Sequence, residues 1–181
     1  MATNTPKAGA AAVPAKDKNT QTRTQKITTF LWFDNKAEEA VNFYVSVFKN
    51  SRIINSTRYG DAGPRPKGTI MTIDFELDGQ RFAALNGGPD FKFTEAISLV
   101  VNCKDQKEVD YYWEKLSEGG GQKVDCGWLK DKFGLSWQVT PEILLDLIQS
   151  PDEAKQQRVM KAMMKMKKID IAGLERAAAG K

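Results

Sequence analysis

Residues 27–48 read ITTFLWFDNKAEEAVNFYVSVF and join a strand pattern to a helix pattern. The first seven are mostly β-branched or aromatic, which predicts a strand that is buried on both faces. Asp34 and Asn35 then interrupt the apolar run and can cap a helix. From Ala37 to Phe48 the apolar residues recur at helical spacing, so an amphipathic helix is expected directly after the strand.

The same order returns 70 residues later, counted from Ile27 to Ile97. Residues 96–103 (AISLVVNC) predict a second strand, and residues 105–118 predict a helix that ends at a glycine run. An internal repeat of this kind indicates a duplicated βαβββ unit and an α+β fold. The strands expected after the two helices lie near 52–59, 68–77 and 80–85 in the first copy and near 122–124, 126–130 and 135–139 in the second.

The two ends of the chain differ from its middle. Residues 1–25 hold almost no large apolar side chain, which predicts a disordered tail, with an expression remnant as the other interpretation. Helices are expected over 142–149 and over 152–167, the second of which is rich in methionine. We therefore divide the chain into the tail, a paired βαβββ domain at 26–150, and a Met-rich helical extension at 151–181 that packs on the domain or on a dimer partner.

The net charge of +4 is concentrated at the two ends. Residues 1–25 carry four basic and one acidic side chain, and residues 151–181 carry eight and four, so the region between them is slightly acidic. Basic ends alone are no basis for a surface that reads nucleic acid specifically. The chain also lacks the ~20-residue apolar run of a membrane span and an apolar secretory signal. We expect a cytoplasmic protein with neither membrane nor specific nucleic acid as partner.

The chain contains no histidine. This excludes Ser-His-Asp and Cys-His catalysis by its own residues and removes the commonest ligand for zinc, iron and nickel. Cys103 and Cys126 belong to no CxxC pair and are interpreted as free thiols. Acid–base chemistry would fall to carboxylates, Lys, Tyr or Cys, and no cofactor is expected. Asp74 with Glu76, and Glu108 with Asp110, are paired acids that we interpret as solvated surface.

Several short motifs occur in a fixed order along residues 26–176. They are LWFD at 31–34, FELDGQ at 75–80, LNGGP at 85–89 and CGWLKD at 126–131. Together they resemble the PhnB-like proteins of the vicinal oxygen chelate superfamily, which includes glyoxalase and bleomycin-resistance proteins. The resemblance implies paired βαβββ modules whose curled mixed sheets surround a cavity, often completed by a homodimer, with additional C-terminal helices.

Many PhnB-like proteins carry the name 3-demethylubiquinone-9 3-methyltransferase. The usual site for a methyl donor such as S-adenosylmethionine needs a glycine-rich turn from a strand into a helix. The run Gly119–Gly121 follows a predicted helix instead, so we interpret it as the end of that helix.

Enzymes of the superfamily hold a divalent metal on four strand positions. The resemblance carries these over to Thr29, Asn86, Ser98 and Gln138, with a one-residue shift in register allowed at Asn86. None of the four is charged or an imidazole, so no metal is predicted. The four side chains are nevertheless expected to face the cavity.

Three aromatic residues, Phe91, Phe93 and Trp128, are expected to form the rim of that cavity. Alternatively, the four polar side chains satisfy one another or hold water, and the aromatic residues belong to the core. Trp32 and Trp137 are out of phase with Thr29 and Gln138, so both should turn toward the helices.

The resulting hypothesis is metal-free binding of a small, partly apolar molecule in the cavity of a homodimer. The alternative is an enzyme, either a metal-free lyase or isomerase or the methyltransferase of the family name, with unknown catalytic residues. A dimeric scaffold whose cavity is filled by side chains is a third possibility.

Overall fold

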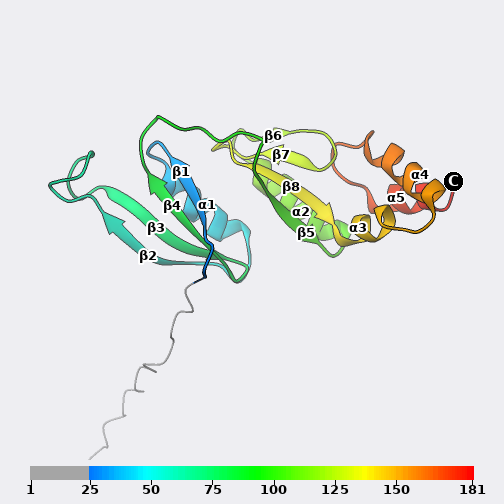
Figure 1. Cartoon of the computed structure of the whole chain (residues 1–181), viewed down its shortest axis with the longest axis horizontal. Helices are drawn as coiled ribbons and strands as arrows, with labels where there is room; N and C mark the ends of the chain where they lie inside the picture. Colours follow the sequence, from blue (N-terminus) through cyan, green and yellow to red (C-terminus); the bar gives the residue numbers. More distant parts are fainter. Residues whose placement is uncertain (1–24) are drawn as a thin grey trace, which may run out of the picture.

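The computed structural model describes residues 25–181, so the expected tail lies outside the described residues except for Gln25. Two four-stranded sheets lie one after the other along the long axis, and the C-terminal helices lie beyond the second (Figure 1). The first module contains β1 (Thr29–Phe33), α1 (Ala37–Val47), β2 (Arg52–Arg58), β3 (Ile70–Leu77) and β4 (Gln80–Asn86). Its strand order is β1-β4-β3-β2, with β1 parallel to β4 and the other pairs antiparallel.

The second module repeats this plan. Its elements are β5 (Ser98–Cys103), α2 (Gln106–Ser117), β6 (Gln122–Lys123), β7 (Trp128–Lys130) and β8 (Ser136–Pro141). The strand order is β5-β8-β7-β6, and again only the first pair is parallel. The duplicated βαβββ unit and the α+β class predicted from the sequence are therefore confirmed, including the very short strand at 122–123.

Three helices follow the sheets: α3 (Glu142–Ile148), α4 (Glu153–Met163) and α5 (Ile171–Ala178). The sequence pattern predicted α4 to run to residue 167 and did not predict α5. In the structure the carbonyls of Met166 and Lys167 each accept a backbone hydrogen bond of 2.7 Å from the second module, which holds this segment in a turn. The three helices share a separate apolar core made of Leu144, Leu147, Val159, Ile169 and Leu174.

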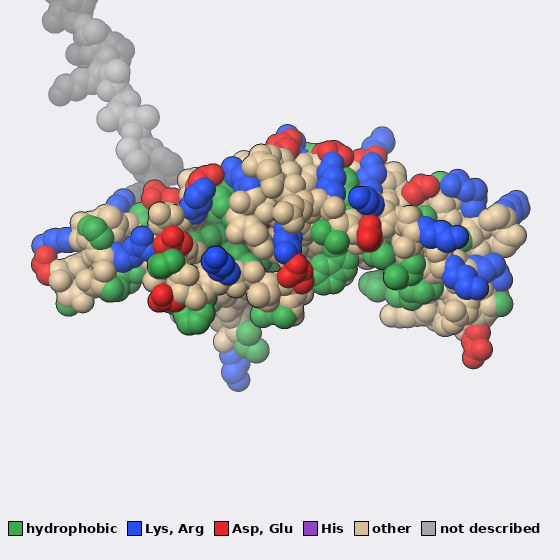
Figure 2. Space-filling model, turned by 90° about the horizontal axis from the view of Figure 1, so that it is seen from above, with side chains coloured by type: hydrophobic (Ala, Val, Ile, Leu, Met, Phe, Trp, Pro, Cys, Tyr) green, Lys and Arg blue, Asp and Glu red, His purple; other side chains and the backbone are tan. Residues whose placement is uncertain are grey.

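The surface of this C-terminal unit is basic, as the charge count of the sequence indicates. Figure 2 shows Lys and Arg side chains gathered at the end of the molecule that α4 and α5 form. Within residues 25–181, none of the helices is both long and apolar enough to cross a membrane.

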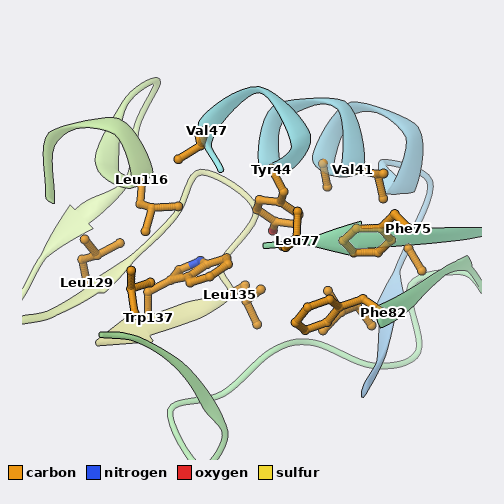
Figure 3. Close-up of a cluster of buried hydrophobic side chains, with 14 of the residues drawn as sticks. Val41, Tyr44, Val47, Phe75, Leu77, Phe82, Leu116, Leu129, Leu135 and Trp137 are labelled. Carbon is orange, nitrogen blue, oxygen red and sulfur yellow. The ribbon is translucent and has the colours of Figure 1, made fainter. Parts of the chain in front are cut away.

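A single apolar core connects the two modules. Figure 3 shows Tyr44 and Val47 of α1 pointing into the same core as Leu116 of α2 and Trp137 of β8. The helices cover one face of each sheet, and we call the opposite face the open face. Because strand side chains alternate between faces, every second residue of a strand lies on the open face.

The strand at 27–33 was predicted to be buried on both faces, and this is wrong. Leu31 and Phe33 are buried against the helices, but Phe30 is 57% exposed on the open face. An apolar run indicates that both faces of the strand avoid water, but it does not identify what covers the second face. Within residues 25–181, no element of this chain covers Phe30.

Asp131 makes a buried polar contact between the modules. Its side chain is 3% exposed in the turn between β7 and β8. Oδ2 accepts hydrogen bonds of 2.8 Å from the Tyr44 hydroxyl and from Trp137 Nε1, and Oδ1 accepts from the backbone N–H groups of Phe133 and Leu135. Burial raises the pKa of Asp131, and the four donors offset part of that rise. Burial also raises the pKa of Tyr44, and the nearby Asp131 carboxylate adds to this rise.

Replacing this carboxylate should cost the protein much of its stability. D131N puts an amide where two of the four donors need an acceptor, so we expect the free energy of unfolding to fall by about 3 kcal/mol. Y44F removes one donor and should cost about 1 kcal/mol. Urea denaturation measures both, with D125N as the control because Asp125 is exposed. Equal midpoints for D131N and D125N would contradict the structural role of Asp131.

The same carboxyl group should make stability depend on pH. Its folded-state pKa is raised above the ordinary 3.8, so its contribution to stability is fully present below 3.8 and is lost as pH rises through the folded-state value. The stability difference between wild type and D131N should therefore be larger near pH 4 than near pH 7. A difference that grows toward neutral pH would show that the four donors outweigh burial.

Candidate ligand-binding site

The open face of the second sheet brings three of the predicted site residues together. Gln138 Nε2 donates a hydrogen bond of 2.8 Å to Ser98 Oγ. Trp128 on β7 pairs in register with Gln138 on β8, so their side chains lie on the same face. Ser98, Gln138 and Trp128 are each partly buried, which leaves them accessible to a small molecule.

Ser136 adds a polar group that the sequence prediction missed. Its side chain is 1% exposed, and its hydroxyl has no hydrogen-bond partner among residues 25–181. It lines a pocket of about 310 Å³ with Trp128, Val124 and Lys130 among its walls. We call this the sheet pocket. The sequence spacing could have identified Ser136, because it is two residues before Gln138 and therefore lies on the same strand face.

An ion pair borders the sheet pocket. The Lys130 ammonium contacts the carboxylate of Glu95, which belongs to the segment between β4 and β5. The hydrogen bond that Lys130 donates to Glu95 is the main reason that the pKa of Glu95 lies below its ordinary value. The sheet pocket thus combines an apolar indole wall, an unpaired hydroxyl and a charged edge.

Asn86 does not join this group. Its Oδ1 accepts a hydrogen bond of 2.8 Å from the backbone of Ala37, and its Nδ2 donates to the carbonyl of Ile70. Asn86 is 7% exposed, so both polar ends of its amide are satisfied inside the first module. Lys36 precedes α1 without making a side-chain cap, and Asn86 supplies that cap from a distant strand.

Thr29 also lies away from Ser98 and Gln138. It alternates in phase with Leu31 and Phe33, whose side chains point toward the helices. The open-face positions of the strand are instead Phe30 and Trp32. The structure therefore places Thr29 and Asn86 on the helix side of the first sheet, one residue out of phase with its open face.

Trp32 and Phe91 form an aromatic pair on the first module. Trp32 Nε1 donates a hydrogen bond of 2.9 Å to the carbonyl of Gly88, and the two ring centroids are 4.9 Å apart, edge to face. Phe91 is 64% exposed. The prediction that Trp32 turns toward the helices is wrong, whereas Trp137 is 2% exposed in the core, as predicted.

Three titratable side chains away from the sheet pocket have pKa values that burial or hydrogen bonding shifts. Burial, as the largest effect, raises the pKa of Cys103 to about 12. Hydrogen bonds lower the pKa of Glu108, which bonds to Lys104, and of Asp110, which bonds to Lys168, so both carboxylates act as charge partners. Among residues 25–181 there is no group of three or more Cys, Asp or Glu that could hold a metal ion, and the predicted lack of a metal stays a prediction.

Comparison with known proteins places these observations in a family. Residues 25–140 match the model of the family described as 3-demethylubiquinone-9 3-methyltransferase. No curated protein sequence matches the chain. Among solved structures, one from Bacillus cereus, described as a PhnB protein of this kind, is 42% identical. It has a TM-score of 0.59, and the match covers 65% of this chain and 99% of that one.

A second solved structure supports the fold alone. A Pseudomonas aeruginosa protein is 21% identical with a TM-score of 0.55, and the match covers 66% of this chain and 98% of that one. Both matched structures are therefore shorter than this chain, and they correspond in extent to roughly the two modules.

The packing of Trp32 can be tested at Gly87. A Cβ atom at this position would overlap the indole ring of Trp32. We expect G87A to displace the ring, to break its hydrogen bond with Gly88, and to cost about 1–3 kcal/mol of stability through overpacking. The Trp32 indole ¹⁵N–¹H resonance and urea denaturation report the two effects. G60A is the control, because a Cβ at Gly60 meets nothing within 4 Å, and an unchanged indole resonance in G87A would contradict this packing.

Proposed function

The chain belongs to the 3-demethylubiquinone-9 3-methyltransferase family, the PhnB-like branch of the vicinal oxygen chelate superfamily, and we propose that it binds a small, partly apolar molecule without a metal. The binding surface of this proposal is the open face of the second sheet. Its contacts are Ser98, Gln138 and Trp128, together with the sheet pocket.

The unpaired hydroxyl of Ser136 carries this proposal. A buried polar group without a partner costs about 1–3 kcal/mol, and proteins rarely keep one without a reason. Ser98 and Gln138 share one hydrogen bond and are partly exposed, so water can meet their remaining capacity, whereas Ser136 is buried. A ligand that exchanges a hydrogen bond with Ser136 and lays an apolar face on Trp128 would use both features of the pocket.

In this proposal a second copy of the chain completes the binding surface. The proposal also includes a cytoplasmic location for the protein. Phe30 and Val100 are large apolar side chains on the open faces of the two sheets, and they are 57% and 52% exposed. Burying such side chains stabilises an association by the hydrophobic effect. A homodimer that covers both open faces would turn them into the walls of an enclosed cavity.

Methyl transfer is the alternative favoured by the family description. The glycine run gives it no support, because Gly119 and Gly120 have φ values of 74° and 110° directly after α2. This left-handed conformation is typical of a helix C-terminus. Gly121 is packed against the carbonyl of Lys130 with no room for a Cβ, and its N–H donates to the carbonyl of Ser117, as expected at the end of a helix.

A thermal-shift screen of the purified full chain separates these functions. The compounds are S-adenosylmethionine, quinone-like phenols, small thiols and divalent metal salts, because a ligand that binds only the folded state raises Tm. Stabilisation by a phenol or a thiol alone supports the binding function. Stabilisation by S-adenosylmethionine supports methyl transfer, and stabilisation by a metal at stoichiometric concentration overturns the metal-free proposal.

The S136A variant tests the site itself. Removing an unpaired buried hydroxyl should leave the free protein as stable as wild type or up to about 1 kcal/mol more stable. The same change should remove most of the Tm shift caused by any stabilising ligand found in the screen. S46A is the matched control, since that hydroxyl is exposed and bonds only to the carbonyl of Phe43. A full ligand shift in S136A would exclude Ser136 from the site.

A further inference from the structure

A second pocket lies where β1 ends, and it shares no residue with the site proposed above. It has a volume of about 460 Å³ and opens between the end of β1, the segment joining β4 to β5, and the turn between β7 and β8. Its apolar walls are the rings of Trp32, Phe91, Phe93 and Phe133. We call it the aromatic groove.

The rings of the groove are held in place before any ligand binds. The hydrogen bond to Gly88 fixes the indole of Trp32. Phe33 packs edge to face against both Phe93 and Phe133, at centroid distances of 5.2 and 6.2 Å. A preformed wall of this kind favours a flat apolar molecule, because little side-chain freedom is lost when the molecule enters.

Three lysines line the same groove: Lys36, Lys92 and Lys132. Lys36 and Lys132 share one carboxylate, that of Glu39, at 3.9 and 3.2 Å. Lys92 has no ion-pair partner within residues 25–181. The groove therefore carries more positive than negative charge.

The position of Lys132 makes its positive charge act more strongly on a ligand in the groove. Its ammonium lies 5.1 Å from the ring centroid of Phe43 and 5.0 Å from that of Phe133, and its side chain is only 28% exposed. Partial removal from water makes a charge interact more strongly with a ligand than it would at the surface. Asp34 also lines the groove, but its carboxylate pairs with Arg65 at 3.7 Å and so adds little negative charge.

This combination selects one class of ligand. Aromatic walls alone would suit a cationic ligand through cation–π contacts, but three lysines repel a cation. The same lysines attract an anion, and the rings accept a flat hydrophobic body. We propose that the aromatic groove binds a planar aromatic carboxylate, with its ring system packed against the Trp32–Phe91 pair and its carboxylate facing Lys92 and Lys132. The volume is in the range of small-molecule pockets and suits a bicyclic ring.

The four tryptophans allow a test that reports each pocket separately. Trp32 lies in the groove and Trp128 in the sheet pocket, while Trp113 and Trp137 are 3% and 2% exposed in the core. An indole ¹⁵N–¹H spectrum of the full chain gives one resonance for each, and W32F and W128F assign the two accessible ones. The probes are 2-naphthoate and its neutral amide, 2-naphthamide, which differ mainly in charge.

We expect 2-naphthoate to shift the Trp32 resonance and to bind about tenfold more tightly than 2-naphthamide, as one charge-assisted contact provides. The K92Q/K132Q double variant should lose about tenfold in affinity for 2-naphthoate and keep its affinity for 2-naphthamide. K107Q is the matched control, since Lys107 is exposed on α2 and does not line the groove. F91A should weaken both probes without affecting folding, because Phe91 is mostly exposed.

Four results would overturn this assignment. One is equal affinity for the two probes, and another is unchanged 2-naphthoate binding in K92Q/K132Q. The third is a shift of Trp128 with no shift of Trp32, which would place the ligand in the sheet pocket and support the proposed function instead. Absence of any indole shift would equally exclude an aromatic carboxylate from the groove while leaving the sheet pocket open to other ligands.

Discussion

Asp131 buries a carboxylate where α1 of the first module meets the turn between β7 and β8 of the second. A buried charge of this kind is tolerated only when donors surround it, and here two side chains and two backbone N–H groups do so. The Tyr44 hydroxyl is the donor that belongs to the other module. This buried contact therefore helps to fix how the two sheets are placed with respect to each other, which apolar packing alone would leave less specific.

Both candidate pockets depend on the turn that Asp131 organises. Lys132 and Phe133 extend from it into the aromatic groove, and Ser136 begins the strand that lines the sheet pocket. The segment between β4 and β5 runs across from one module to the other (Figure 1). It supplies Phe91 to the groove and Glu95 to the edge of the sheet pocket. The geometry of the aromatic groove, which has residues of both modules in its walls, thus follows from the placement of the modules.

The sequence predicts the order of elements well because each has its own local signal. Asp105 caps α2 through its contact with the N–H of Glu108, as its position before an apolar helical pattern indicates. The prediction of which sheet face each side chain occupies is correct in β5 and β8, where polar Ser98 and Gln138 mark the open face. It fails in β1, because a strand that is apolar on both faces has no such mark. The end of α4 also could not be predicted, since backbone contacts with a distant segment cause it.

The side chains of the two pockets are consistent with the proposed recognition of a ligand. A general acid or base works best when its pKa is close to the ambient pH, and a chain without histidine lacks the side chain that usually provides this. Burial takes the pKa of Cys103 to about 12, and the carboxylate of Asp131 is committed to four donors inside the core. What the pockets do offer is a neutral hydroxyl in one and lysine charge beside fixed aromatic rings in the other. Such groups distinguish ligands by shape, polarity and charge, which is what the proposed binding function requires.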